Sequence, residues 1–456
     1  MGKKKKWLIG LVSTCIILAA AWGGVYAYGN QTDIPSGYAL FDWRLGNQQP
    51  EQLKKEWSKK LTELDQRPIQ FKVAEGVEEN ESQTQIPLGE LGLQWNDQEV
   101  LQEILAYSSE EKLYKRVLHR FKAIFREPFE LTPQWNEQEV KTALHKAWPA
   151  LFEQQPVNAK RWINEKDEVM YEAEQAVLQP DFPKLMEQLK SLKGEQMWKE
   201  GPLLVELPLK RAEPTITVQD LKDEGIQRKI SEFTTMYAAN AGGRTHNVET
   251  TAEILNDTLL SPDEVFSYQD IVTKTEEAFG YKPAPVIMEG ELRQGIGGGI
   301  CQVSTTLYNA ALLSDLEIVE RRNHSLPIGY APLGRDATFT SDGGIDFRFK
   351  NTTGKKLLIR TEAKNGKLTI KLFGTSPEEK EIEIVSETVN VIPPPTKVKK
   401  DASLASGQQR VLQNGKPGYQ VSVYKRVKVN GEVVDQVLIS KDTYRPQPKT
   451  ILTGMN

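Results

Sequence analysis

The first 28 residues contain the longest apolar run of the chain. Lys3 to Lys6 precede an apolar stretch from Trp7 to Tyr28 that contains no charged residue. A helix of that length spans the core of a bilayer. The lysines should stay on the cytoplasmic side, which places the rest of the chain outside. We therefore expect residues 1–28 to be a single-pass membrane anchor. A cleaved signal peptide, cut at Val25-Tyr26-Ala27, is the alternative, and the length of the stretch favours the anchor.

Residues 38–214 follow a short polar linker and mix helical periodicity with short apolar runs. Residues 94–100 (Gln-Trp-Asn-Asp-Gln-Glu-Val) recur as residues 134–140 (Gln-Trp-Asn-Glu-Gln-Glu-Val). In each copy the asparagine, Asn96 or Asn136, can cap a helix, and a glutamate three residues later completes a capping-box pattern. Runs such as Leu203 to Leu209 are typical of strands. This region is predicted to be a helix-rich α+β domain without a catalytic constellation.

Residues 216–376 show a different pattern, in which one long helix is followed by strands. Val303, Leu307, Ala310 and Leu313 fall on one helix face, which predicts a buried helix from about residue 301 to 314. Residues 251–260 are also helix-like. Apolar runs predict strands at 230–237, 316–319, 346–350, 357–361 and 368–373. Residues 351–355 and 365–366 are typical of hairpin turns. The pattern predicts a helix packed on an antiparallel sheet.

Residues 381–456 are rich in β-type alternation, as at Val421, Val423, Val427 and Val429, and Asn430-Gly431 is a strong hairpin signal. The predicted fold class is therefore α+β and multidomain. We expect an N-terminal membrane helix, a helix-rich α+β domain, a domain with a helix on an antiparallel sheet, and a small all-β C-terminal domain.

Composition narrows the cellular setting of this 456-residue chain. The formal net charge of -4 argues against nucleic acid as a main partner. Two cysteines in an exported chain of this length provide no disulfide framework, which suits a Gram-positive type of envelope. Cys15 lies inside the apolar run, where a buried apolar role is the simplest interpretation. Cys301 is then the one cysteine of the exported part.

The segment that points most directly to chemistry is Gly297-Gly298-Gly299 with Cys301 just after it. Glycines allow positive φ and a close approach of backbone to a ligand. The predicted helix would begin at Cys301, where backbone N–H groups and the helix dipole favour a thiolate. A free cysteine is also often a small buried hydrophobic residue, so a packing role for Cys301 stays open.

His324 follows Cys301 after one predicted helix and one predicted strand, so the chain can bring the imidazole back to the thiol. A nearby imidazole would deprotonate the thiol and hold the thiolate as an ion pair. Asp336, Asp342 or a backbone carbonyl would orient the ring. Arg322 or Arg335 would hold a substrate carboxylate by a two-pronged contact. His324 and Arg322 as ordinary loop residues remain the alternative.

No metal and no cofactor are expected. His119 and His145 lie in helical segments of residues 38–214 without a ligand partner at helical spacing, and His246 and His324 lack cysteine or histidine partners at ligand spacing. Surface or packing roles fit His119 and His145 better.

Several segments match one known family in the same order along the chain. They are Arg244–Val248, Val265–Tyr268, Gly280-Tyr281, Gly297–Ala310, Arg321–Pro327, Tyr330–Thr338, and Phe347, Lys350 and Asn351. On these motifs residues 229–374 resemble the VanW family, named after an accessory protein of glycopeptide-resistance clusters. The chain departs from the usual family pattern at Pro262-Asp263-Glu264 and Tyr268-Gln269. Those positions lie in a turn and a loop outside the glycine-cysteine motif.

Two further resemblances flank that region. Leu91-Gly92-Leu93, residues 156–159 (Pro-Val-Asn-Ala) and residues 214–217 (Pro-Thr-Ile-Thr) resemble a proposed peptidoglycan-binding domain often found before VanW domains and some L,D-transpeptidases. The tail from residue 381 resembles the five-glycine domain, a small twisted β structure linked with adhesion, sugar or zinc binding and the cell wall. Its glycines would be Gly407, Gly415, Gly418, Gly431 and Gly454. Turn geometry explains them equally well, so we assign them no chemistry.

The resemblances imply a membrane-anchored, extracytoplasmic protein that acts on peptidoglycan, with stem peptides or wall glycans as partners. One hypothesis is a cysteine acyltransferase of the L,D-transpeptidase type, with Cys301 as nucleophile and His324 as base and then acid. Backbone N–H groups of residues 297–302 would form the oxyanion hole. The other hypotheses are a non-catalytic wall-binding or accessory scaffold and a structural regulator. The candidate substrate-binding residues are Gly298, Gly299, Gln302, Arg322, Ser325, Arg335 and Asp336.

Overall fold

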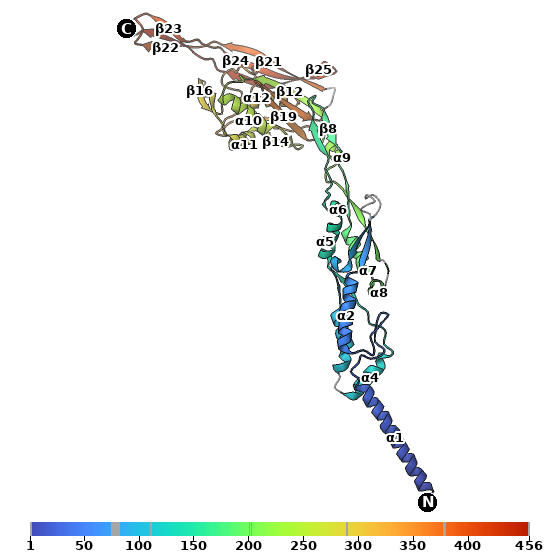
Figure 1. Ribbon diagram of the computed structural model, residues 1–456. Coiled ribbons are helices and arrows are strands. Elements are labelled where there is room, and N and C mark those ends of the chain that lie inside the picture. Colours follow the sequence, from blue (N-terminus) through green and yellow to red (C-terminus); the bar gives the residue numbers. More distant parts are fainter. Residues whose placement is uncertain are drawn as a thin grey trace. The chain divides into compact units, whose positions relative to one another are not determined.

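The computed structural model describes residues 2–73, 83–109, 112–199, 201, 203–288, 291–376 and 380–454 (Figure 1). The chain divides into two compact units. The first contains residues 1–157 and 175–214, and the second contains residues 158–174 and 215–456. The second unit thus joins the predicted domains 216–376 and 381–456. It also takes the hairpin of β7 (Lys160–Ile163) and β8 (Val169–Glu172) out of the region 38–214.

The first unit begins with α1 (Lys3–Gly29), which contains a segment, Lys5–Gly29, long and apolar enough to cross a membrane. Its other helices are α2 (Pro50–Asp65), α3 (Asp97–Leu105), α4 (Leu113–Ala123), α5 (Glu137–Ala147), α6 (Pro149–Glu153), α7 (Phe182–Ser191) and α8 (Gly194–Trp198). Its strands are β1 (Ala39–Leu40), β2 (Trp43–Arg44), β3 (Pro68–Val73), β4 (Gln83–Pro87), β5 (Leu93–Trp95), β6 (Pro133–Trp135), β9 (Val177–Pro180), β10 (Leu203–Leu207) and β11 (Leu209–Ala212).

The repeat found in the sequence is also a structural repeat. β5 and β6 pair antiparallel with Gln94 opposite Gln134, and each strand leads into a helix, α3 or α5. Asn136 caps α5 by accepting from the backbone of Gln138 and Glu139. Asn96 does not cap α3, because its side-chain oxygen accepts from the Thr132 amide at 2.7 Å instead. The predicted cap is therefore confirmed at Asn136 and wrong at Asn96.

The second unit is built around α12 (Ile300–Leu313). Its other elements before the C-terminal strands are α9 (Val218–Asp223), β12 (Arg228–Met236), α10 (Gly243–Leu255), β13 (Thr258–Leu260), β14 (Val265–Ser267), α11 (Tyr268–Phe279), β15 (Pro283–Met288), β16 (Glu291–Ile296), β17 (Glu317–Glu320), β18 (Arg348–Lys350), β19 (Leu357–Lys364) and β20 (Lys367–Gly374). Two antiparallel sheets result, in the orders β12-β20-β19-β13 and β14-β18-β17, with β15 and β16 as a separate hairpin.

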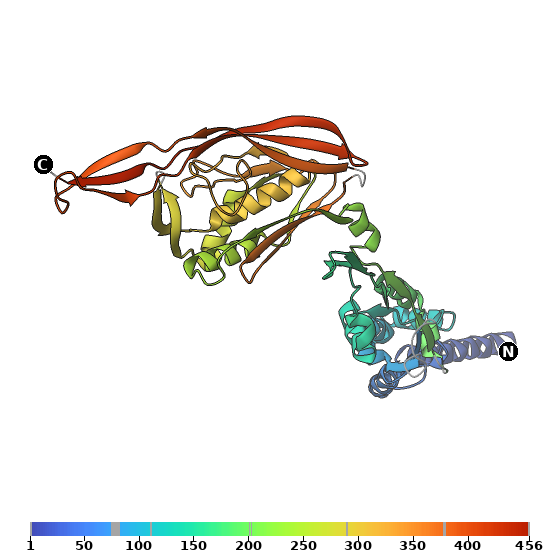
Figure 2. The ribbon, with the colours of Figure 1, turned by 90° about the horizontal axis from the view of Figure 1, so that it is seen from above.

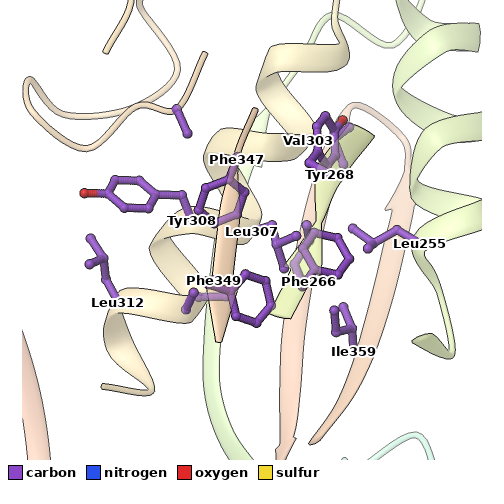
Figure 3. Packing of buried hydrophobic residues seen from close by; sticks show 14 of the residues in the cluster. Leu255, Phe266, Tyr268, Val303, Leu307, Tyr308, Leu312, Phe347, Phe349 and Ile359 are labelled. Atoms are coloured by element: carbon purple, nitrogen blue, oxygen red, sulfur yellow. The ribbon is translucent and has the colours of Figure 1, made fainter. Parts of the chain in front are cut away.

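The predicted helix at 301–314 and the packing of a helix on an antiparallel sheet are confirmed. Leu307 is fully buried and packs with Phe266, Phe349 and Ile359 in one core (Figure 3). The α12 helix is buried on nearly all sides, because Ser304, Thr305 and Asn309 are inaccessible too. The apolar periodicity showed only one of its buried faces.

Two local predictions are wrong. Residues 251–260 do not form one helix, since α10 ends at Leu255 and β13 begins at Thr258, after Asp257 turns the chain with φ 61°. Residues 351–355 are not a hairpin turn, since β18 and β19 belong to different sheets. There the fully buried Asn351 side chain bonds the carbonyls of Leu260, Ser261 and Lys355. The Asn365-Gly366 hairpin is confirmed, with φ of 55° and 76°.

The C-terminal strands are β21 (Lys380–Ile392), β22 (Thr396–Asp401), β23 (Gln409–Gln413), β24 (Gly418–Val429), β25 (Glu432–Tyr444) and β26 (Lys449–Gly454). They form two sheets, β21-β24-β25 and β22-β26-β23. The all-β prediction is confirmed for the described residues; residues 377–379, 455 and 456, at the predicted limits, lie outside them. Ile382, Ile384, Val421, Val423 and Tyr444 share one core with α12, so the first sheet is packed on the preceding domain (Figure 2).

Candidate active site

Cys301 is the second residue of α12, directly after the glycine loop. Gly297 and Gly299 have φ of 81° and 113°, which side-chain-bearing residues rarely adopt. A Cβ on Gly298 would lie 2.7 Å from the Ala284 Cβ and from the Pro285 carbonyl oxygen. The glycines are therefore needed for the turn into α12 and for its close approach to β15.

The glycine loop is pinned by a buried amide. Asn247 on α10 is fully buried, its Nδ2 donates to the carbonyls of Gly298 at 3.0 Å and Lys282 at 2.9 Å, and its Oδ1 accepts from the Lys282 amide at 2.8 Å. The buried Tyr268 hydroxyl donates to the Ile300 carbonyl at 2.8 Å. These contacts fix the start of α12 from two neighbouring helices.

His324 lies beside the Cys301 thiol and is held from behind by Asp336. The His324 Nδ1 and Asp336 Oδ2 are 2.6 Å apart, and the His324 backbone N–H donates to the same oxygen at 2.6 Å. Because Nδ1 is engaged by Asp336, Nε2 is the ring nitrogen that remains for Cys301, which interacts electrostatically with His324. Cys301, His324 and Asp336 thus follow one another in the order that a nucleophile, a base and an orienting acid would need.

The electrostatics of the site favour an ion pair between Cys301 and His324. Burial opposes ionisation of Cys301, but the hydrogen bond and charge of His324 and the charge of Arg244 outweigh it and lower the pKa of the thiol. Burial likewise opposes protonation of His324, yet Asp336 and Cys301 together raise its pKa to about 9. Each group of the pair therefore favours the charged form of the other, thiolate for Cys301 and imidazolium for His324. The Sγ also lies 3.5 Å from the Phe339 carbonyl oxygen.

The loop that carries Asp336 is bonded to the polar face of α12. The Asn309 Nδ2 donates to the Arg335 carbonyl at 2.7 Å, and the Ala337 amide donates to the Thr305 hydroxyl at 3.0 Å. Asp336 itself is fully buried and its pKa is lowered, because His324 and Arg321 outweigh the effect of burial. The buried polar residues of α12 therefore position Asp336, which in turn positions the His324 ring.

Gln302 and Asp336 are both fully buried, whereas a residue that binds substrate has to be accessible from solvent. Gln302 is fully buried, its Oε1 accepts from the Arg244 guanidinium at 2.8 Å, and its Nε2 donates to Thr235 at 3.0 Å and to the Met236 carbonyl at 2.9 Å. Its amide side chain is thus already bonded. The Arg244 guanidinium lies 5.8 Å from the centre of the Tyr330 ring. Burial and the neighbouring Cys301 charge raise the pKa of Tyr330.

The remaining candidates lie at varied distances from the thiol. The Arg335 Nε donates to Asn309 at 2.6 Å. Asn309 is eight residues beyond Cys301 on α12, about 12 Å along the axis. The Arg322 side chain is exposed, Ser325 is partly buried with its carbonyl bonded to the Arg445 amide, and Asp342 is exposed and bonded to the Gly344 amide. Of the two predicted ring-orienting acids, the structure brings Asp336 to His324.

Arg244, Tyr268, Tyr330 and Tyr444 were not assigned roles from the sequence. Arg244 and Tyr330 each begin one of the matched family motifs, which was a usable signal. Tyr444 belongs to the C-terminal strands, and no local pattern connects it with Asp336. Among the described residues, no group of three or more His, Cys, Asp or Glu side chains is arranged to hold a metal ion. His119 bonds the Tyr38 hydroxyl at 2.6 Å, and His145 lies 3.3 Å from Glu153.

The model of the family described as "VanW like protein" matches residues 243–373, which hold Cys301, His324 and Asp336. The chain carries a VanW-like domain. The G5 domain model matches residues 383–456, so the small β domain that follows is a G5 domain. Together these domains indicate a protein associated with the cell wall.

Two relatives share this VanW-like region. The chain is 34% identical over 194 residues to the uncharacterized protein YoaR of Bacillus subtilis, covering 42% of this chain and 63% of YoaR. It is 32% identical over 126 residues to the vancomycin B-type resistance protein VanW of Enterococcus faecalis, covering 26% of this chain and 44% of that protein. The chain thus spans less than two thirds of either relative.

Two solved G5 structures are similar to the C-terminal part. The crystal structure of HP0197-G5 is 33% identical, with 16% of this chain and 95% of that chain covered and a TM-score of 0.12. The IgA1 protease G5 domain structure is 29% identical, with 18% of this chain and 99% of that chain covered and a TM-score of 0.14.

Proposed function

We propose that the VanW-like domain is a cysteine acyltransferase that acts on peptidoglycan stem peptides, in the manner of an L,D-transpeptidase. The observation that carries this proposal is the row of Cys301, His324 and Asp336 at the start of α12. A buried cysteine that only packs needs neither a lowered pKa nor an oriented imidazole. The pairing of the two is what nucleophilic catalysis requires.

In the first step the Cys301 thiolate attacks the carbonyl carbon of a stem-peptide amide. A C–S bond forms, and the carbonyl electrons move to oxygen. When the tetrahedral intermediate collapses, the C–N bond breaks and the His324 imidazolium gives its proton to the leaving amine. The products of this step are a thioester on Cys301, a released amine and a neutral imidazole.

In the second step an amine of a neighbouring stem attacks the thioester. His324 takes the proton of that amine, the new C–N bond forms, and the C–S bond breaks. Thiolate and imidazolium are restored, so the cycle consumes no oxidant, reductant or cofactor. Asp336 holds the ring and stabilises the imidazolium throughout.

The oxyanion of the intermediate needs donors close to the sulfur. The Cys301 amide lies in the first turn of α12, where N–H groups have no partner within the helix, and no acceptor for it lies in the described part of the chain. We assign the oxyanion site to this amide and to the amides of Gly298 and Gly299, since those of Gly297 and Ile300 already donate to backbone carbonyls. Gln302 is a poorer donor than its sequence position indicated, because Thr235 and Met236 already accept from its Nε2.

In this proposal the other parts of the chain hold the VanW-like domain between the membrane and the cell wall. The α1 helix would anchor the protein as a single-pass membrane helix, with the bulk of the chain extracytoplasmic and facing the wall. Residues 38–214 would bind peptidoglycan, and the G5 domain would bind the wall. Arg322, with its exposed side chain, and Ser325 remain proposed substrate contacts near His324.

The test is incubation of the full chain with purified muropeptides, followed by mass spectrometry. Wild type is compared with Cys301→Ser and with the matched control Cys15→Ser, which alters the other cysteine. We expect cross-linked or trimmed products from wild type and Cys15→Ser and none from Cys301→Ser. Muropeptide binding without turnover by all three proteins would instead support the wall-binding scaffold.

A further inference from the structure

The end of β25, in the G5 domain, contacts the loop that carries Asp336. The Tyr444 hydroxyl donates to Asp336 Oδ1 and accepts from the Gly334 amide at 2.6 Å. One residue further, the Arg445 amide donates to the Ser325 carbonyl at 2.8 Å. The G5 strand therefore bonds both the loop behind the acid and the loop of the base.

Tyr444 and His324 bind different oxygens of the Asp336 carboxylate. Its hydroxyl occupies Oδ1, whereas Oδ2 accepts from the backbone and ring of His324. Tyr444 is fully buried, and burial together with Asp336 raises its pKa, so the hydroxyl stays a donor. A carboxylate bonded in this way has one orientation, with Oδ2 on the imidazole.

Asp442, two residues before Tyr444, sets the charge behind the site. Both its carboxylate oxygens accept from Arg321 NH1, at 2.8 and 2.7 Å. Arg321 also donates to the Asp336 carbonyl at 2.6 Å, and its NH2 lies 3.3 Å from Asp336 Oδ1. The Tyr308 ring lies beneath the guanidinium at 5.0 Å. Arg321 is a buried cation between two carboxylates. Asp442 offsets part of its positive charge, so that Asp336 is not its only counterion.

We infer that the first sheet of the G5 domain is part of the catalytic unit, with Tyr444 and Asp442 as positioning residues that hold and electrostatically shield Asp336 behind His324. This inference rests on the proposed function of the VanW-like domain and deepens it. The wall-binding domain and the catalytic domain would then work only as one body.

The packing between the two domains agrees with this inference. A Cβ on Gly334 would lie 2.3 Å from the Val423 Cγ2, so the Asp336 loop is in close contact with β24. Val421, Val423 and Tyr444 are buried against this loop and α12. Removal of residues 381–456 would expose that core, so point variants of the full chain are the right test.

The test follows the reaction of Cys301 with iodoacetamide across pH in the full chain with Cys15→Ser. Tyr444→Phe removes the hydroxyl that donates to Asp336 Oδ1, and Asp442→Asn removes the negative charge that offsets Arg321. Both changes weaken the hold of Asp336 on His324. The midpoint of thiolate formation should therefore rise by roughly 0.5–1 pH unit in each variant. Tyr419→Phe is the matched control, since Tyr419 pairs with Tyr444 across β24 and β25, and it should keep the wild-type midpoint.

An unchanged midpoint in folded Tyr444→Phe, judged by its near-UV circular dichroism, would overturn the inference even if Asp442→Asn failed to fold. The alkylation needs no muropeptide. A wild-type protein with no turnover but with shifted midpoints in the variants would therefore contradict the proposed function and leave the link between the domains standing.

A second inference concerns α4, in the first unit, which exposes an apolar face. Leu118 and Phe121 are 48% and 56% exposed, Tyr114 continues the same face one turn earlier, and Phe125, in the turn just after α4, is 76% exposed. An amphipathic helix normally buries such a stripe. The charged side chains of Lys115 and Lys122, three residues before and four residues after Leu118, flank this stripe and are exposed too.

This face is continuous with the apolar surface of α1. A Cβ on Gly29 would lie 2.6 Å from Leu113 Cδ1 and 2.7 Å from Val117 Cγ2, so the end of α1 packs directly on α4. Arg116 NH2 donates to Asn30 Oδ1 at 2.6 Å, which fixes the junction. A groove between the two helices is lined by Trp22, Val25, Tyr28, Tyr114, Leu118 and Phe121.

We propose that α4 lies in the outer surface of the bilayer that α1 crosses, with its apolar face among the acyl chains. Tyr and Trp suit the interface between headgroups and acyl chains, and the flanking lysines suit anionic headgroups. This inference rests on α1 as a membrane anchor. It would set the height of the first unit above the membrane.

The test places spin labels in the full chain, with Cys15→Ser and Cys301→Ser, in nanodiscs containing anionic lipid. Labels at Leu118→Cys and Phe125→Cys should be more accessible to oxygen and less accessible to a nickel chelate than a label at Lys59→Cys, an exposed position on α2. Equal aqueous accessibility at all three positions would overturn the inference. A label at Ile17→Cys, in the middle of α1, reports separately whether the anchor itself spans the bilayer.

Discussion

Asp336→Asn is the substitution that most directly tests the electrostatics of the site. The change keeps the shape of the side chain and removes the charge that holds the His324 ring. The rise in the pKa of His324 from 6.5 to about 9 corresponds to about 3 kcal/mol in favour of the imidazolium. The hydrogen bond with Asp336 is the largest favourable contribution to that rise.

Loss of half of this preference, about 1.5 kcal/mol, lowers the thiolate population about tenfold where the thiol is mostly protonated. We therefore expect the Asp336→Asn variant to react with iodoacetamide up to about tenfold more slowly than wild type at pH 7. The rates should converge near pH 10, where the thiol ionises without help. Turnover should fall further, on the order of 10³-fold, because the ring also loses its orientation.

The assay is mass-spectrometric alkylation of Cys301 in the full chain with Cys15→Ser, from pH 5 to 10. Asp342→Asn is the control, since Asp342 lies on the same connection between β17 and β18 but is exposed. The reasoning is refuted if Asp336→Asn keeps the wild-type rate at pH 7, or if Asp342→Asn slows the reaction equally.

Three further predictions follow from the same geometry. Gly299→Ala places a Cβ 3.0 Å from Val248 Cγ2 at a φ of 113°, and should cost about 1–3 kcal/mol in thermal or chemical unfolding; Gly343→Ala, with a positive φ but open space, should cost less. Asn247→Ala removes three hydrogen bonds, leaves the buried Gly298 carbonyl without its partner, and should lower the free energy of unfolding by about 2–4 kcal/mol, whereas the exposed Asn390→Ala should change it by less than about 0.5 kcal/mol. The raised pKa of His324 means that its imidazolium persists below about pH 9 and is lost as the pH rises through that value, so turnover should fall along an alkaline limb near pH 9; a rate that keeps rising above pH 9 would exclude His324 as the acid.

The parts of the fold that were correctly predicted are those encoded by neighbours in the chain. The α12 helix, the Asn365-Gly366 hairpin and the apolar α1 each follow from a spacing or dipeptide within a few residues. The α11 helix was missed, although Tyr268, Ile271, Val272 and Thr275 are buried at helical spacing, because most of its other positions are polar. In α11 the helical spacing of the buried residues is present in the sequence, but the many polar residues between them obscure it.

The sequence by itself determined the chemistry on offer, namely a cysteine after three glycines, a histidine within reach and two acids that could orient it. Only the tertiary structure decided that Asp336 rather than Asp342 holds the ring, and that Gln302 is bonded within the core. It also brought Tyr444 to Asp336 across 108 residues. The physical reason is that a helix or turn forms from local backbone preferences, whereas a buried carboxylate is oriented by whichever donors the packed chain brings to it.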